Sequence, residues 1–97
     1  MDGSPAAGHL FLSVALLRLN RLEEAEKGAR EALLRKPGFA SAYLMLAEVH
    51  ARRAEYGMEL HDLDAYLKLE SDGPASTRVR EVREGVRLIV LRAKAQE

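Results

Sequence analysis

The sequence repeats itself at a fixed offset, and this internal repeat limits the possible folds more than any single residue does. Pairs of identical residues 34 positions apart include Leu10 with Leu44, Leu12 with Leu46, Arg18 with Arg52 and Leu33 with Leu67. A period of about 34 residues is the length of one helix–turn–helix unit in a solenoid of stacked helices. We therefore expect an all-α fold built from two successive helical hairpins, an architecture that binds other molecules more often than it converts them.

Turn residues and the spacing of apolar residues divide the chain into five predicted helices. Their expected ranges are about residues 4–19, 22–34, 40–53, 56–69 and 75–95, and the first opens at Ser4-Pro5, a hydroxyl cap followed by a proline. Tight turns at Asn20-Arg21 and Ala54-Glu55 separate the two helices of each hairpin, and Pro37-Gly38 and residues 71–74 end the hairpins. The predicted organisation is one domain over residues 1–97, with a repeat over about 6–39, a second over about 40–73, and a closing helix over about 75–95.

Each predicted hairpin carries a similar series of residues at fixed spacing. The first has His9-x2-Leu12-Ser13-x2-Leu16, then Ala25-x3-Ala29 and Pro37, and the second has Tyr43-x2-Leu46-Ala47-x2-His50, then Glu59-x3-Leu63 and Ser71. These series resemble the tetratricopeptide repeat, in which each unit has an aromatic residue, a leucine followed by a small residue, a tyrosine, an alanine and a final proline. The resemblance implies that Leu12 and Leu46 lie at helix crossings, and that Ser13 and Ala47 let paired helices approach closely.

The last predicted helix departs from this pattern, because Arg80-Glu81 stands where each hairpin has its leucine and its small residue. Its apolar residues keep a spacing of three and four along one side: Val79, Val82, Val86, Ile89 and Ala93. Such a helix, with charges on its other side, is typical of the cap that closes a solenoid. A coiled coil is an alternative, although it would span fewer than three heptads. A nucleic-acid-binding helix is another, although glutamates interrupt the arginines.

The composition favours neither nucleic acid nor a membrane as a partner. Fifteen basic and fifteen acidic residues give a formal net charge of zero, so no broad electrostatic footprint is expected. The apolar run at residues 10–17 resembles a signal-peptide core, but the only charge before it is Asp2, and Arg18 ends it. The run is also shorter than the roughly 20 residues that span a bilayer. We expect no membrane association and a cytoplasmic location.

No catalytic or cofactor-binding arrangement is recognisable in the sequence. There is no cysteine, and His9 and His50 stand where the repeat has aromatic residues, which predicts packed rings. His61 and Asp64 share a helix face, but two groups do not form a metal site. Glycines do not form a phosphate-binding loop before a helix. We therefore expect neither an enzyme nor a cofactor.

The resemblance also implies where a partner binds, because the first helix of each tetratricopeptide repeat lines a concave groove that accepts an extended or helical peptide. The implied partner-binding residues are Leu10, Phe11, Val14, Leu17, Arg18, Leu44, Met45, Glu48 and Arg52. Leu10, Val14 and Met45 occupy the positions where some family members hold a peptide carboxylate, so a carboxylate clamp is not expected. Leu10, Phe11, Val14 and Leu17 remain as apolar anchors, which suit an amphipathic partner helix with its own apolar residues at spacing i, i+3, i+4, i+7.

Three classes of function remain open at this point. The first is a non-catalytic adaptor or scaffold module that binds a protein or peptide partner. The second is a structural module that associates with a second copy, because the first predicted helix is apolar on almost every side and such a helix requires cover. The third is part of a larger protein, in which an upstream repeat covers that helix, or a non-catalytic segment of an enzyme or envelope protein.

Overall fold

The computed structural model describes residues 5–96, which form five helices. They are α1 (Pro5–Arg18), α2 (Leu22–Arg35), α3 (Ala40–Arg52), α4 (Tyr56–Leu69) and α5 (Ser76–Ala95). These residues contain no strand, so the predicted all-α fold is confirmed. The predicted helix bounds differ from the observed ones by one residue at most, apart from the cap predicted at Ser4, which lies outside the described residues.

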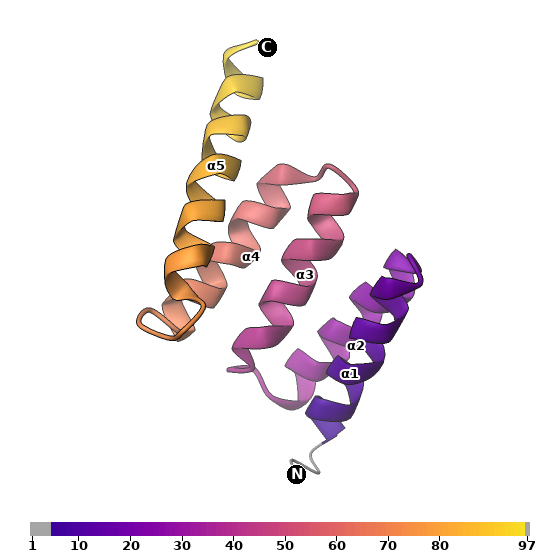
Figure 1. Cartoon of the computed structure of the whole chain (residues 1–97). Coiled ribbons are helices and arrows are strands. Elements are labelled where there is room, and N and C mark those ends of the chain that lie inside the picture. Colours follow the sequence, from indigo (N-terminus) through magenta and orange to yellow (C-terminus); the bar gives the residue numbers. More distant parts are fainter. Residues whose placement is uncertain (1–4, 97) are drawn as a thin grey trace.

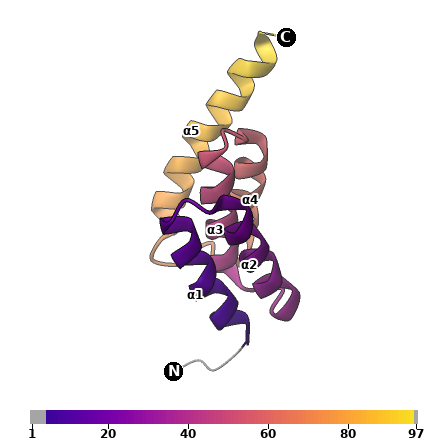
Figure 2. The same ribbon diagram turned by 90° about the vertical axis from the view of Figure 1, so that its right-hand side faces the viewer.

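The helices form two hairpins, α1 with α2 and α3 with α4, followed by α5. Helix α3 packs against both helices of the first hairpin, whereas α5 packs against α4 alone among the described elements. Helices α1 and α5 therefore lie at opposite ends of the stack (Figure 1). The C-terminal half of α5 extends beyond the other helices in both views (Figures 1 and 2). The arrangement is a short solenoid with one end formed by α1 and the other by α5.

The two turns within the hairpins have the same backbone geometry. Asn20 and Ala54, which are equivalent across the repeat offset, are the only non-glycine residues with positive φ in the described part of the chain, and φ is 58° at both. The next residue donates its N–H five residues back, from Arg21 to Leu16 at 2.9 Å and from Glu55 to His50 at 2.8 Å. This is the Schellman ending of a helix. Helices α2 and α4 also begin and end at equivalent positions, so the repeat in the sequence is also a repeat in the backbone.

Small residues bring α1 and α2 close together. The buried Ser13 hydroxyl donates a hydrogen bond to the carbonyl of Ala25 at 2.6 Å. A Cβ added at Gly28 would lie 3.2 Å from the Cβ of Ser13 and 3.3 Å from the carbonyl oxygen of His9. Contacts this short leave little room for any larger residue, so Ser13 and Gly28 together set the separation of the two helices.

The second hairpin and α5 share one apolar cluster. Its buried members are Ala40, Ala47, Leu63, Tyr66, Val79 and Val86. Leu46 is buried, with 2% of its surface exposed, as the resemblance implied. The same prediction for Leu12 is wrong, because 56% of Leu12 is exposed. Helix α3 has the first hairpin beside it, whereas no described helix precedes α1 and covers Leu12.

The turn at Ala54 gives the first testable prediction. An L-alanine in the left-handed region is strained by roughly 1 kcal/mol, whereas asparagine tolerates that conformation. We expect Ala54→Asn to raise the free energy of unfolding by about 0.5–1 kcal/mol, measured by urea denaturation with circular dichroism. Asn20→Ala makes the reverse change at the equivalent turn and should lower it by a similar amount. Shifts of the same sign in the two variants would contradict the shared turn geometry.

Candidate functional site

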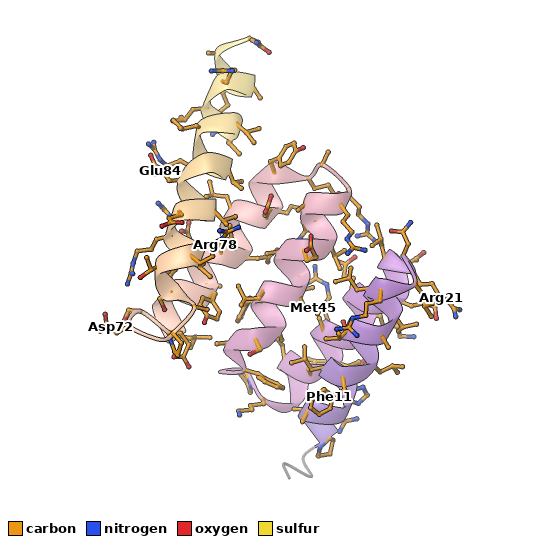
Figure 3. The ribbon with its side chains drawn as sticks, viewed as in Figure 1. Phe11, Arg21, Met45, Asp72, Arg78 and Glu84 are labelled. Carbon is orange, nitrogen blue, oxygen red and sulfur yellow. The ribbon has the colours of Figure 1, made fainter. Side chains whose placement is uncertain are left out.

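An exposed apolar stripe runs along α1 and continues one residue past its end. It consists of Gly8, Phe11, Leu12, Ala15 and Leu19, all exposed, and is called the α1 face below. Phe11 is 70% exposed and Leu12 56% exposed. Figure 2 shows α1 in front of the stack with no helix covering it, and Figure 3 labels Phe11 on this helix. A continuous apolar surface of this kind, on a helix that is well packed on its other side, often marks an interaction site.

The α1 face is uncharged over most of its length. Residues 5–17 contain no aspartate, glutamate, lysine or arginine. Arg18, which is exposed, follows directly and ends the helix. A partner that lies along α1 therefore meets apolar side chains first and a single positive charge at the C-terminal end.

Two of the predicted partner-binding residues belong to the core. Leu10 packs with Ala32 and Ala42, and Leu17 packs with Ala25 and Val49. Their exposed fractions are 9% and 7%, so neither side chain offers surface to a partner. Of the other predicted residues, Phe11, Arg18, Glu48 and Arg52 are exposed, and Val14, Leu44 and Met45 are half-buried.

The charged end of the predicted groove helps to hold the two hairpins together. Nη1 of Arg52 donates a hydrogen bond to the carbonyl of Leu17 at 2.8 Å, which joins α3 to the end of α1. Nε of Arg52 also lies 3.9 Å from Oε2 of Glu48, one helical turn earlier. Part of the hydrogen-bonding capacity of Arg52 is thus used inside the molecule.

A hollow of about 380 Å³ lies between α1 and α2, beside the α1 face. It is lined by His9, Leu12, Leu16, Glu24, Lys27, Gly28 and Glu31. Leu12 belongs to both the hollow and the α1 face, so the accessible apolar surface continues from the stripe into the hollow. The sequence indicated Leu12 as a packing residue, and its exposure depends on the absence of a described helix before α1.

A group of polar and charged side chains lies where the two hairpins meet. His50, 1% exposed, lies with Nδ1 2.5 Å from Oδ2 of Asp62, and its Nε2 lies 3.8 Å from Oε2 of Glu26. Glu26 accepts hydrogen bonds from Arg53 at 2.6 Å and Arg30 at 2.7 Å. The network connects α2, α3 and α4. His50 is therefore buried as predicted, but through a hydrogen-bonded pair that the sequence pattern does not indicate.

The surroundings of three carboxyl groups in and beside this network shift their pKa values. The hydrogen bond from Arg53 lowers the pKa of Glu26, and Arg30 acts in the same direction. Burial raises the pKa of Asp62, although its hydrogen bond with His50 opposes the rise. Burial also raises the pKa of Glu59, and the nearby carboxylates of Glu48 and Asp62 raise it further.

The network has the character of a structural contact between helices. His50 and Asp62 are almost completely enclosed, which leaves no route for a substrate to reach them. Nε2 of His50 makes no hydrogen bond. In the part of the chain that the structure describes, no group of three or more histidine, aspartate or glutamate side chains could hold a metal ion. Asp64, which the sequence places on one helix face with His61, pairs with Arg83 of α5.

Comparison with known proteins yields no relative. No protein-family model, no curated protein and no solved structure matches the chain. Among residues 5–96, no helix has both the length and the hydrophobicity needed to cross a membrane. The structure therefore defines the class as an all-α protein of stacked helical hairpins, and membership of the tetratricopeptide family stays a prediction.

The buried pair gives a second prediction. Asp62→Ala would leave the buried His50 ring without its hydrogen-bonding partner, which typically lowers the free energy of unfolding by about 2–4 kcal/mol. The double variant His50→Leu, Asp62→Ala removes both polar groups and should recover at least half of that loss. Leucine is a suitable replacement because Leu16 occupies the equivalent position of the first hairpin. A double variant less stable than Asp62→Ala alone would show that the pair is not a coupled unit.

Glu59 gives a third prediction, on pH dependence. Its pKa is raised above the ordinary value of 4.5 in the folded chain, so the stability that the protonated group contributes is present below pH 4.5 and is lost as pH rises through the folded pKa. Glu59→Gln removes this loss. In urea titrations, we expect the free energy of unfolding of the variant, relative to that of the parent, to be higher at pH 7 than at pH 4. Glu81→Gln, which changes an exposed carboxylate of α5, is the control, and an equal effect of Glu59→Gln at both pH values would contradict the prediction.

Proposed function

We propose that this chain is a non-catalytic protein–protein interaction module with tetratricopeptide-like architecture, which binds a helix of a protein partner. The observation that supports this most directly is the α1 face, where Phe11 and Leu12 are exposed at the centre of an uncharged stripe. Full burial of one such side chain typically contributes about 1.5–3 kcal/mol. Two or three apolar anchors of this kind commonly supply most of the affinity of an interface.

Two exposed charged residues suit an orienting role. Arg18 stands at the C-terminal end of α1, beside the stripe, and Glu48 lies on α3. A partner helix with charges of opposite sign at these positions would be held in one orientation, because charged groups at the rim of an interface contribute more to specificity than to affinity. Leu44 and Met45 contribute less to a partner contact, because Leu44 packs on the core of the second hairpin and Met45 packs between the hairpins.

A structural self-association module is the second candidate, and one observation favours it. The projecting half of α5 exposes Leu88, Ile89 and Leu91, each by about half of its surface. Two apolar surfaces at opposite ends of one molecule could contact each other between copies. Light scattering over a roughly hundredfold range of concentration separates the candidates, since self-association raises the mass with concentration.

Substitution at the centre of the α1 face tests the proposed function. Phe11→Glu places a charge on the exposed stripe and should leave the melting temperature and helicity almost unchanged. Leu34→Glu is the matched control, because Leu34 is 76% exposed near the end of α2 and lies outside the α1 face. Proteins that the immobilised parent chain retains from a cell lysate are identified. One of them is purified and titrated by calorimetry against the parent chain, Phe11→Glu and Leu34→Glu.

We expect Phe11→Glu to weaken this binding at least about tenfold, because a charge would be buried against the partner, and Leu34→Glu to leave it unchanged. Equal affinity of the parent and Phe11→Glu would contradict binding through the α1 face.

A further inference from the structure

The contact between the hairpins shows what kind of surface fits the α1 face. Helix α3 docks on the first hairpin through Ala42, Met45 and Val49. Ala42 and Met45 pack with Leu10 and Ala32, and Val49 packs with Leu17 and Ala25. Ala42 and Val49 are completely buried in this contact. These three residues form the docking side of α3.

The docking side of α3 has an equivalent on α1. Moving back by one repeat offset gives Gly8, Phe11 and Ala15, which are three of the five residues of the α1 face. They are exposed, whereas their equivalents on α3 are buried or half-buried. Figure 3 labels the equivalent pair Phe11 and Met45 on α1 and α3. The α1 face is thus the docking side of a helix whose preceding hairpin is not among the described residues.

The same register continues forward into α5. Moving on by one repeat offset from the docking side of α3 gives Ser76, Val79 and Arg83. Ser76 and Val79 are buried, and Arg83 pairs with Asp64 of α4. Helix α5 therefore occupies on α4 the place that α3 occupies on α2. Of the three helices that share this register, only α1 presents its docking side without a described neighbour.

A second copy of the chain does not supply the matching surface. The side of α2 that receives α3 is covered by α3, and the equivalent side of α4 is covered by α5. Docking of α1 from one copy onto either side in another copy would require displacement of a packed helix. The occupant is therefore a hairpin that the described residues do not contain.

The chemistry of the occupant follows from the surface that α3 meets. The receiving side of α2 presents Ala25 and Ala32, seven residues apart and fully buried, with Leu22 and Leu33 beside them. Alanines at that spacing lie on one side of a helix and let a neighbouring helix approach closely. The contact also includes the end of the first helix, where Arg52 donates to the carbonyl of Leu17. Arg18 is the equivalent of Arg52, so the occupant supplies a helix C-terminus as well as an alanine-lined side.

We infer that the α1 face docks a helical hairpin that the described residues do not contain. The second helix of that hairpin presents alanines seven residues apart with leucines beside them, and Arg18 donates to a carbonyl at the end of the first. This inference rests on the proposed function and specifies the partner class, a hairpin that would extend the stack by one unit.

An extended chain tests the fit directly. A second copy of residues 5–38 is placed immediately ahead of Pro5, in place of residues 1–4, so that the added hairpin joins α1 through the same Pro37-Gly38 connection that joins α2 to α3. We expect one cooperative transition, a melting temperature higher by about 5 °C or more, and slower amide exchange along α1. Amide exchange of the added hairpin at the rate of an unfolded chain would overturn the inference.

A substitution in the original α1 makes the test specific. Phe11→Glu should shift the melting temperature of the parent chain by less than about 3 °C, since the side chain is exposed. In the extended chain the same change should lower it by about 5–10 °C, since a charge would be buried between hairpins. Leu34→Glu in the original α2 is the control and should have similar small effects in both chains. Equal effects of Phe11→Glu in the two chains would overturn the inference.

The remaining outcomes separate this inference from the proposed function. Sedimentation of the parent chain as a dimer that Phe11→Glu dissociates would place a second copy on the α1 face, and would overturn the inference. A further outcome is that Phe11→Glu lowers the melting temperature more in the extended chain than in the parent, while the captured partners bind the parent and Phe11→Glu equally well. That combination would support the inferred fit and contradict the proposed function.

Discussion

The structure depends on one constraint, which is that a hairpin of two helices has more apolar sides than its own helices can cover. Within the first hairpin, Ser13 packs against Gly28 and binds the carbonyl of Ala25, which covers one side of each helix. The alanines of α2 still require a neighbour, and α3 supplies it. Each unit thus completes the core of the unit before it, which is why stability in such stacks resides in the contacts between neighbours.

The contact between hairpins combines two kinds of interaction. Its apolar part is formed by small residues of α2 and by α3, and tolerates little change in volume because the helices approach closely. Its polar part is the His50–Asp62 pair with Glu26, Arg53 and Arg30, which connects α2, α3 and α4. The polar groups suit only one alignment of α3 on α2, because a shift along the helix would separate Arg53 from Glu26. Apolar packing supplies most of the cohesion, and the buried network restricts the register.

Much of the fold is predictable from local signals. Pro37-Gly38, the 71–74 break and the spacing of apolar residues locate all five helices within a residue, because helix ends are set by neighbouring residues in the chain. The site is less predictable, because exposure depends on which helices lie alongside. Leu12 and Leu46 are identical and equivalent, yet one is exposed and the other buried. The tetratricopeptide resemblance places Leu10 and Leu17 in one groove with Phe11, and in an uncharged helix no further signal separates the buried side from the exposed one. The His50–Asp62 contact joins residues 12 positions apart on different helices, and no periodicity indicates it.

The position of α5 has a consequence for how this molecule associates. A stack that is open at both ends can add copies of itself without limit, because a head-to-tail contact that does not close into a ring generates a filament. Here α5 covers the far side of α4 with Val79 and Val86, and Arg80-Glu81 stands where a further hairpin would need a leucine and a small residue. Growth by the α3-on-α2 contact is therefore blocked at one end and possible only at the other. If the α1 face docks a hairpin as inferred, each chain accepts one such hairpin through that contact and offers no second place for another.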